Sequence, residues 1–321
     1  MLAQQILAGD RRALAKAITL VESTRADHGE QAVQLLAELM PHTGKSIRIG
    51  VSGAPGVGKS TFIESLGNYL TGQGHQVAVL AVDPTSAVSG GSILGDKTRM
   101  EALSVNPKAF VRPSPAGTTL GGVTRRTRES LLLCEAAGYD VIIVETVGVG
   151  QSETAVSDMT DMFLLLLSPG GGDDLQGIKR GIMELADLVL VNKADGDQAN
   201  LVNQTLSDYR GALQFMQART PGWTPKVHSC SALEGQGIAQ AWAVVEDFRA
   251  VLTESGELEG LRAQQANAWM WAETAAELLA DLRNHPAVSS LVPELEAAVL
   301  AGELPAIVAA QRLIETYKTG Q

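Results

Sequence analysis

The spacing of apolar residues changes twice along the chain and divides it into three regions. Up to about residue 40, apolar positions such as Leu14 and Ile18 recur at helical spacing, and Pro41 and Gly44 end the pattern. Short apolar runs then alternate with helical stretches as far as about residue 248. Helical spacing alone remains beyond that point. The pattern predicts a helical N-terminal extension, an α/β domain and a helical C-terminal arm, over residues 1–44, 45–250 and 251–321.

The apolar runs of the middle region are rich in Val, Ile and Leu and show little polar alternation. Strands buried on both faces of a parallel sheet have this composition. The predicted strands are Ile47–Val51, Val77–Val82, Val141–Val144, Phe163–Leu167 and Leu188–Val191. The predicted helices between and after them are Ser60–Leu70, Thr124–Ala137, Ile178–Ala186, Ala199–Gln217, Leu258–Leu282, Ser289–Leu300 and Leu304–Tyr317. Strands that alternate with helices predict a doubly wound, mainly parallel α/β sheet.

Composition narrows the class of protein. The 321 residues include 25 Lys and Arg against 36 Asp and Glu, a net charge of −11, and only 4% are aromatic. Nucleic-acid and membrane-surface binding both favour a basic face, so neither partner is expected. Two cysteines, Cys134 and Cys230, fit a reducing compartment. With no signal peptide or membrane-spanning run visible, we expect a cytoplasmic protein, or a matrix protein whose transit peptide has been removed.

A glycine-rich segment after the first predicted strand matches the phosphate-loop pattern G-x-x-x-x-G-K-S/T and opens a helix. Its glycines let backbone N–H groups turn toward an anion, and the helix N-terminus adds partial positive charge. Lys59 would bind the β- and γ-phosphates, and the Ser60 hydroxyl would bind Mg²⁺. An ordinary glycine-rich turn is the disfavoured alternative. The loop residues are Gly53, Ala54, Pro55, Gly56, Val57, Gly58, Lys59 and Ser60.

Two further segments fit the recognition of guanine. Asn192, Lys193 and Asp195 form an N-K-x-D motif at the end of a predicted strand. The Asp195 carboxylate can accept hydrogen bonds from guanine N1–H and the 2-amino group, a donor pair that adenine lacks. The Lys193 stem can cover the base. The segment Cys230, Ser231 and Ala232 resembles the S-A motif, whose backbone N–H contacts guanine O6. Alone, the N-K-x-D tetrapeptide would also fit a surface loop after a strand, but its position downstream of the phosphate loop favours the base site. The S-A dipeptide is common and carries little weight by itself.

Acidic residues at predicted strand ends are candidate Mg²⁺ neighbours. Glu145 stands where most GTPases carry the Asp of D-x-x-G, and Gly148 would offer its N–H to the γ-phosphate. Asp83 and Asp96 are further candidates, with a turn residue and a helix N-cap as the alternative readings. Val149 occupies the place of the water-orienting Gln of Ras-like proteins. We therefore expect slow intrinsic hydrolysis that a partner accelerates.

Together these segments resemble one family, the methylmalonyl-CoA-mutase-associated GTPases of the MeaB or ArgK type. The similarity covers nearly the whole chain, and its most specific element, absent from general GTPases, is residues 169–179. Ala54 and Thr85 differ from the family pattern, in which other small residues are expected at these two positions. The segments that carry the resemblance are Gly53–Thr61, Asp83–Ser86, Gly95–Met100, Glu145–Glu153, Pro169–Lys179, Asn192–Asp195 and the Trp-containing tail helix.

The resemblance implies a P-loop GTPase that binds GTP or GDP with Mg²⁺ and includes Thr61 in its nucleotide site. It also implies a chaperone that gates adenosylcobalamin loading and protects or reactivates an acyl-CoA mutase, and a homodimer held by the C-terminal helices. Independently, Trp269 and Trp271 lie on different faces of the tail helix, which favours one of them in a subunit contact.

The segment Pro169–Lys179 follows a predicted strand at the ligand edge of the sheet and is rich in glycine. Asp173, Asp174 and Lys179 add charges that a phosphate or a partner could capture. We therefore hypothesise that the segment reports the nucleotide state and that Lys179 takes part in partner-stimulated hydrolysis. The alternative is a flexible loop with a solvated lysine.

Two other functions compete with the mutase-associated switch. A metallochaperone GTPase for nickel delivery would need a Cys/His metal site, and the five scattered histidines do not form one. An ATP-dependent small-molecule kinase could use the same phosphate loop, but the N-K-x-D motif argues against it.

Overall fold

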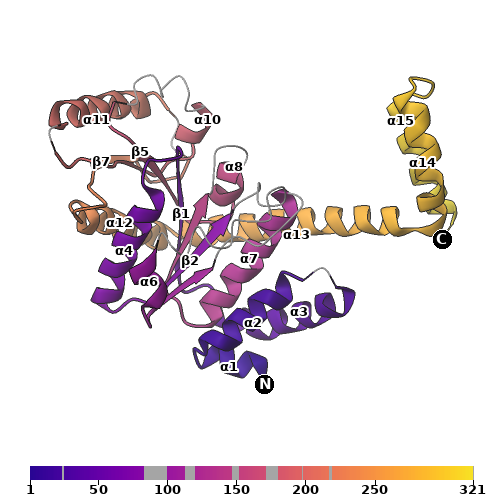
Figure 1. Ribbon diagram of the computed structural model, residues 1–321, viewed down its shortest axis with the longest axis horizontal. Coiled ribbons are helices and arrows are strands. Elements are labelled where there is room, and N and C mark those ends of the chain that lie inside the picture. Colours follow the sequence, from indigo (N-terminus) through magenta and orange to yellow (C-terminus); the bar gives the residue numbers. More distant parts are fainter. Residues whose placement is uncertain are drawn as a thin grey trace. The chain divides into compact units, whose positions relative to one another are not determined.

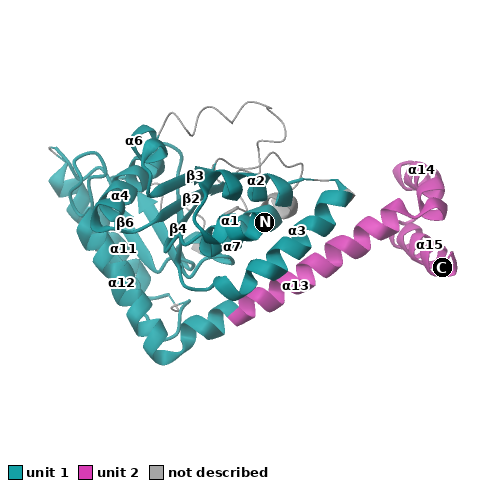
Figure 2. Ribbon diagram, turned by 90° about the horizontal axis from the view of Figure 1, so that it is seen from below, with its two compact units in different colours: residues 1–262 teal, residues 263–321 magenta. Residues whose placement is uncertain are grey.

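The computed structural model describes residues 1–23, 25–82, 100–112, 120–146, 152–170, 180–196, 198–216 and 219–320 (Figure 1). The chain forms two compact units, residues 1–262 and 263–321, which Figure 2 shows in different colours. The N-terminal helices thus belong to the same unit as the sheet. The division into three domains at residues 44 and 250 remains a prediction.

Seven parallel strands form one sheet in the order β3-β2-β4-β1-β5-β6-β7. The five predicted strands are present, and β3 and β7 complete the sheet. This confirms the doubly wound α/β fold. The strands are β1 (Ile47–Gly53), β2 (Val77–Val82), β3 (Ala109–Arg112), β4 (Val141–Thr146), β5 (Met162–Leu167), β6 (Leu188–Val191) and β7 (Lys226–Ser229).

Helices cover both faces of the sheet because alternate strand residues point to opposite sides. On β1, Ile47, Ile49 and Val51 pack in a core with side chains of α4, α6 and α12. The intervening residue Gly50 faces α8, and a Cβ there would lie 2.8 Å from a side-chain atom of Val156. The helices of this unit are α4 (Lys59–Gln73), α6 (Glu101–Val105), α7 (Leu120–Ala136), α8 (Ser152–Ser157), α10 (Arg180–Met183), α11 (Ala199–Gln214) and α12 (Ile238–Ser255).

The helical N-terminal region contains three helices and a 3-10 turn. They are α1 (Leu2–Leu7), α2 (Arg11–Val21) and α3 (Ala26–Leu39), with a 3-10 turn at Met40–His42. Gly9 has φ +78°, which ends the first helix, and Asp10 caps the second by accepting from Arg12 N at 2.8 Å and Ala13 N at 3.1 Å.

Two arginine–carboxylate pairs lie at the amino edge of the sheet, one buried and one partly buried. Arg48 donates to both carboxylate oxygens of Glu135 on α7, at 2.9 and 3.0 Å. Arg262 donates to both oxygens of Asp161, at 2.8 and 2.7 Å, and to the carbonyl of Gly44. Glu135 also accepts from Gly44 N at 2.9 Å and from Ser46 Oγ. The two pairs therefore hold the segment that precedes β1 from both sides.

The helix α13 (Glu257–Asn284) begins in the first unit and continues into the second from Ala263. The second unit also contains α14 (Pro286–Leu300) and α15 (Ala306–Thr319). The tail helices predicted from the sequence match these three closely. Val288 and Leu295 of α14 and Ala309 of α15 are the buried apolar residues of this small unit. His285 and Tyr317 make an edge-to-face ring contact with centroids 5.4 Å apart.

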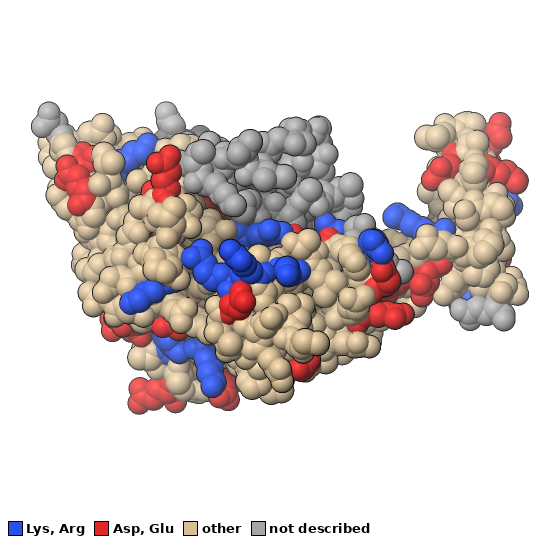
Figure 3. Space-filling model, turned by 60° about the horizontal axis from the view of Figure 1, so that its bottom comes forward, with Lys and Arg blue, Asp and Glu red and all other residues tan. Residues whose placement is uncertain are grey.

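Charge is unevenly distributed over the surface. On the face shown in Figure 3, described Lys and Arg side chains gather in short groups, separated by uncharged and acidic areas, and do not form a continuous basic band. Among the described helices, none is long and apolar enough to cross a lipid bilayer.

Candidate functional site

The phosphate loop connects β1 to α4 at the carboxyl edge of the sheet, where ligands of open α/β folds bind. Gly53 has φ +154°, and a Cβ there would lie 2.5 Å from the carbonyl oxygen of Leu166 on β5. Gly58 has φ +94°, and a Cβ there would lie 2.7 Å from Asn192 Nδ2. Both positions require glycine, because a side chain would collide with neighbouring segments as well as strain the backbone.

Lys59, Ser60 and Glu145 converge beside this loop. The Lys59 ammonium is buried and donates to Gly53 O at 2.8 Å and more distantly to Ala54 O. Ser60 Oγ donates to Glu145 Oε1 at 3.2 Å. Glu145, near the end of β4, is 5% exposed. The structure thus brings together the predicted phosphate-binding lysine and two of the predicted Mg²⁺ ligands, a hydroxyl and a carboxylate, which are oxygen donors that Mg²⁺ favours.

Asn192 follows β6 and connects three parts of the site. Its Nδ2 donates to the phosphate-loop carbonyl of Val57 at 2.9 Å. Its Oδ1 accepts from Ala232 N at 3.0 Å and from Cys230 Sγ at 3.5 Å. The residue is 2% exposed. Asn192 therefore ties the N-K-x-D segment, the phosphate loop and the S-A segment together.

The two charged residues of the N-K-x-D motif differ in their contacts. Lys193 has φ +59°, the one positive φ at a non-glycine residue among the described positions, and its ammonium donates to Gly56 O at 2.7 Å. Its stem therefore extends toward the phosphate loop, and its base-covering role stays a prediction. Asp195 is half-buried rather than buried, and no described residue donates a hydrogen bond to its carboxylate. The carboxylate is thus able to accept from a base.

Backbone N–H groups of the S-A segment already have acceptors within the chain. Cys230 N donates to Val191 O at 2.8 Å, Ser231 N to Gln236 O at 2.9 Å, and Ala232 N to Asn192 Oδ1. The segment lies against Asn192. Ala232 N–H could contact guanine O6 only if its hydrogen bond to Asn192 Oδ1 were broken or if it donated to both oxygens at once.

Four candidate residues lie outside the described part of the chain: Asp83, Asp96, Gly148 and Lys179. Their roles remain predictions. The described residues nevertheless form a site with an N-terminal helix dipole, a buried lysine, a serine–glutamate pair and a base loop around one phosphate loop. This combination can bind a nucleoside triphosphate, because the loop and Lys59 favour anionic phosphates and Asp195 favours a base with paired donors.

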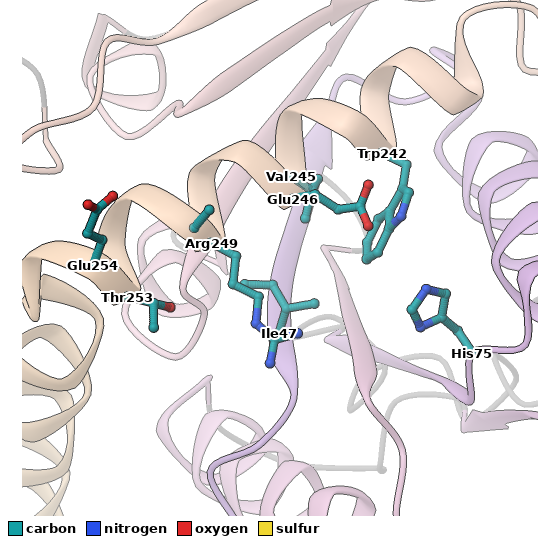
Figure 4. A pocket seen from close by; sticks show the side chains of 9 residues that line it. Ile47, His75, Trp242, Val245, Glu246, Arg249, Thr253 and Glu254 are labelled. Atoms are coloured by element: carbon teal, nitrogen blue, oxygen red, sulfur yellow. The ribbon is translucent and has the colours of Figure 1, made fainter.

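A separate hollow of about 460 Å³ lies at the opposite, amino edge of the sheet (Figure 4). It is lined by α12 side chains, Trp242 and Arg249 among them, and by Ile47 at the start of β1. The rings of His75 and Trp242 make an edge-to-face contact with centroids 5.3 Å apart. His75 Nδ1 is hydrogen-bonded to Asp140 Oδ2 at 2.7 Å. Because the hollow and the phosphate loop lie at opposite ends of β1, the hollow is not part of the nucleotide site.

Comparison with known proteins decides the family. A family model described as methylmalonyl-CoA mutase-associated GTPase MeaB matches residues 14–287. The chain belongs to the MeaB family. As a member of this family with a P-loop GTPase fold, it is a GTPase that binds a guanine nucleotide. The resemblance inferred from the motifs is therefore confirmed at the level of family and activity.

Relatives and a solved structure agree with this assignment. The chain is 52% identical over 271 residues to GTPase ArgK of Escherichia coli, which covers 84% of this chain and 82% of that protein. It is 48% identical over 324 residues to the methylmalonic aciduria type A homolog, mitochondrial, of Mus musculus, covering 98% and 78%. A crystal structure described as an LAO/AO transport system kinase superposes with TM-score 0.77 at 40% identity, covering 99% and 96%.

The sequence-based interpretation missed one functional link. Sequence reasoning placed Asn192 in the base site, which stays a prediction, and did not include the hydrogen bonds that its side chain makes with Val57 O and Ala232 N. The motif itself marked the residue, but Val57 and Ala232 lie 135 and 40 positions away along the chain. Only the approach of β1, β6 and β7 at one sheet edge shows that these three segments meet.

Proposed function

We propose that this MeaB-family GTPase is a nucleotide-dependent chaperone of an adenosylcobalamin-dependent acyl-CoA mutase of the methylmalonyl-CoA type. In this proposal it gates cofactor loading and protects or reactivates the mutase. The observation that carries the proposal is the family match over residues 14–287, because that family is named for its association with the mutase. The mouse relative, whose name refers to methylmalonic aciduria, supports the same metabolic context.

The proposed nucleotide chemistry uses residues of the phosphate loop and strand ends. Residues 53–61, with Lys59 as the cation for the β- and γ-phosphates, would hold GTP. Asn192, Lys193 and Asp195 would hold its base. Ser60 and Glu145, which are 3.2 Å apart, would bind Mg²⁺, which would supply positive charge at the phosphates. We propose the cytoplasm as the site of action.

The function is tested by GTP turnover of the full chain with and without a purified adenosylcobalamin-dependent methylmalonyl-CoA mutase. We expect slow turnover alone and faster turnover with the mutase, and we expect cobalamin transfer to the mutase to depend on GTP. Lys179→Ala should retain basal turnover and lose most of the stimulation, because the proposed loop contact with the partner is removed.

Lys45→Ala is the matched control, since Lys45 is exposed and precedes β1 at the amino edge. It should be stimulated like the wild type. Turnover that is the same with and without the mutase would contradict the chaperone role. Full stimulation of Lys179→Ala would remove only the role of Lys179.

We also propose that the second unit forms a homodimer contact. Its helices expose many large apolar side chains, which a surface in water rarely retains in such number. A second copy of the same unit would bury them. These residues are Met270, Trp271, Leu278, Leu279, Leu300, Ile307 and Ile314.

Replacing Leu300 and Ile307 by glutamate should convert a dimer into a monomer that still binds GTP, because buried unpaired carboxylates oppose association. Light scattering at micromolar concentration measures the mass. Val33→Glu, at a 64% exposed apolar position of α3 in the first unit, is the control and should remain dimeric. A wild-type chain of monomeric mass would refute the proposed contact.

A further inference from the structure

Cys230 is the first residue of the S-A segment and is held in place by backbone hydrogen bonds to the end of β6 and to the N-K-x-D segment. Its N–H donates to Val191 O at 2.8 Å, and its carbonyl accepts from Ala194 N at 3.0 Å. These bonds hold it against the end of β6 on one side and the N-K-x-D segment on the other. The residue is 2% exposed and belongs to the main apolar core. Its side chain therefore has little freedom, and it is directed at Asn192.

The thiol contributes to the orientation of the Asn192 amide. Asn192 Oδ1 faces two donors, Ala232 N–H and the Cys230 S–H, whereas Nδ2 faces the carbonyl of Val57. Rotating the amide by 180° would set an NH₂ group against two donors and an oxygen against a carbonyl. Both groups would then lose their hydrogen bonds in a buried place, which is costly.

Burial raises the pKa of the Cys230 thiol to about 12. The sulfur therefore keeps its proton at neutral pH. A protonated thiol is a weak hydrogen-bond donor, and a carbonyl oxygen such as Asn192 Oδ1 is a suitable acceptor. The same burial makes the side chain inert as a nucleophile.

We propose that Cys230 is a positioning residue for guanine-nucleotide binding, whose S–H holds the Asn192 amide in the orientation that joins the base loop to the phosphate loop. The proposal rests on the nucleotide site proposed above. Asn192 Nδ2 holds Val57 O beside the phosphate-binding glycines, so loosening the amide would loosen the phosphate and base contacts together. Binding of GTP and GDP should weaken by similar factors.

The test compares two replacements of Cys230 in the full-length protein. Cys230→Ala removes the donor and should raise the Kd of GDP and of GTP by roughly three- to tenfold. It should raise KM for GTP more than it lowers kcat, because the reacting atoms are not touched. Cys230→Ser restores a donor and should keep the Kd within about twofold of the wild type. If the alanine variant does not fold, Cys230→Val, which also lacks a donor, replaces it.

Two controls separate positioning from packing. Cys134→Ala removes the other buried thiol, on α7, and should change thermal stability without changing the Kd. In an Asn192→Ala background, Cys230→Ala should cause no further loss of affinity, because the acceptor of its S–H is gone.

Equal affinities of the wild type and Cys230→Ala would overturn the proposal, as would equal losses in the alanine and serine variants. An additional loss in the Asn192→Ala background would overturn it as well. A wild-type protein that binds neither GDP nor GTP would instead contradict the proposed nucleotide site, and this outcome is distinguishable from the others.

Discussion

Replacing Asp195 by asparagine should lower the affinity for GTP by about 3 kcal/mol, roughly a hundredfold. The carboxylate offers two acceptors to guanine N1–H and the 2-amino group, whereas the amide sets its NH₂ group against a donor. Xanthosine triphosphate has a carbonyl in place of the 2-amino group, so it should gain affinity for the variant. The Asp195 carboxylate is half-buried and accepts no hydrogen bond from a described residue, so it is able to accept both hydrogen bonds from guanine.

Competition titrations with GTP, xanthosine triphosphate and ATP measure the effect. Asp208→Asn, the same chemical change at an exposed position of α11, should leave all three affinities unchanged. Wild-type protein that binds ATP as tightly as GTP would show that Asp195 does not read the base. An Asp195→Asn variant with no preference for xanthosine triphosphate would lead to the same conclusion.

Glu135→Gln should lower the free energy of unfolding by about 3–5 kcal/mol, because it leaves the Arg48 guanidinium buried without its counter-charge. The two side chains are 1% and 6% exposed. Glu129→Gln on the same helix is the control, since Arg125 in the pair with Glu129 is 41% exposed and such surface pairs contribute about 0–1 kcal/mol. Urea unfolding followed by circular dichroism measures both. If Glu135→Gln lowers the free energy of unfolding by less than about 1 kcal/mol, Glu135 is not the buried counter-charge of Arg48.

The same carboxylate affects acid stability. Burial alone would raise the pKa of Glu135, but hydrogen bonds from Arg48, Ser46 and Gly44 lower it below the usual value near 4.5. A carboxyl whose pKa is lower in the folded state stabilises the fold at pH values above its unfolded pKa. That contribution is lost as the pH falls through the folded pKa. The wild type should therefore lose this contribution below about pH 4.5, and Glu135→Gln should lack that part of the pH dependence.

Much of the sheet could be predicted because β2, β5 and β6 are short, wholly apolar runs, and β4 begins with one. The strand β3 was missed because it has four residues and ends in Arg112, so it lacks a long buried run. The helix α12 was not assigned although it carried a signal. Its residues Ala241, Val245, Phe248 and Leu252 recur at helical spacing and are buried. The predicted boundary at residue 250 falls inside this helix, which packs on one face of the sheet.

The candidate site could be predicted where its residues are close together in the sequence. The phosphate loop follows its strand and opens its helix, so Lys59 and Ser60 could be placed from the sequence alone. The pairs Arg48–Glu135 and Arg262–Asp161 could not be placed, because their members are 87 and 101 positions apart. An arginine within a strand suggests only that a partner exists. Which carboxylate reaches it depends on how α7 and α13 pack.

The shortness of the outer strands of the sheet has a consequence for self-association. The strands β3 and β7 lie at its two edges, and each has only four residues. An exposed edge recruits another strand most effectively when it is long and flat, because each added residue contributes unpaired N–H and C=O groups. These edges present few such groups. Strand addition, fibre growth along the sheet and capture of an extended peptide at these two edges are therefore disfavoured.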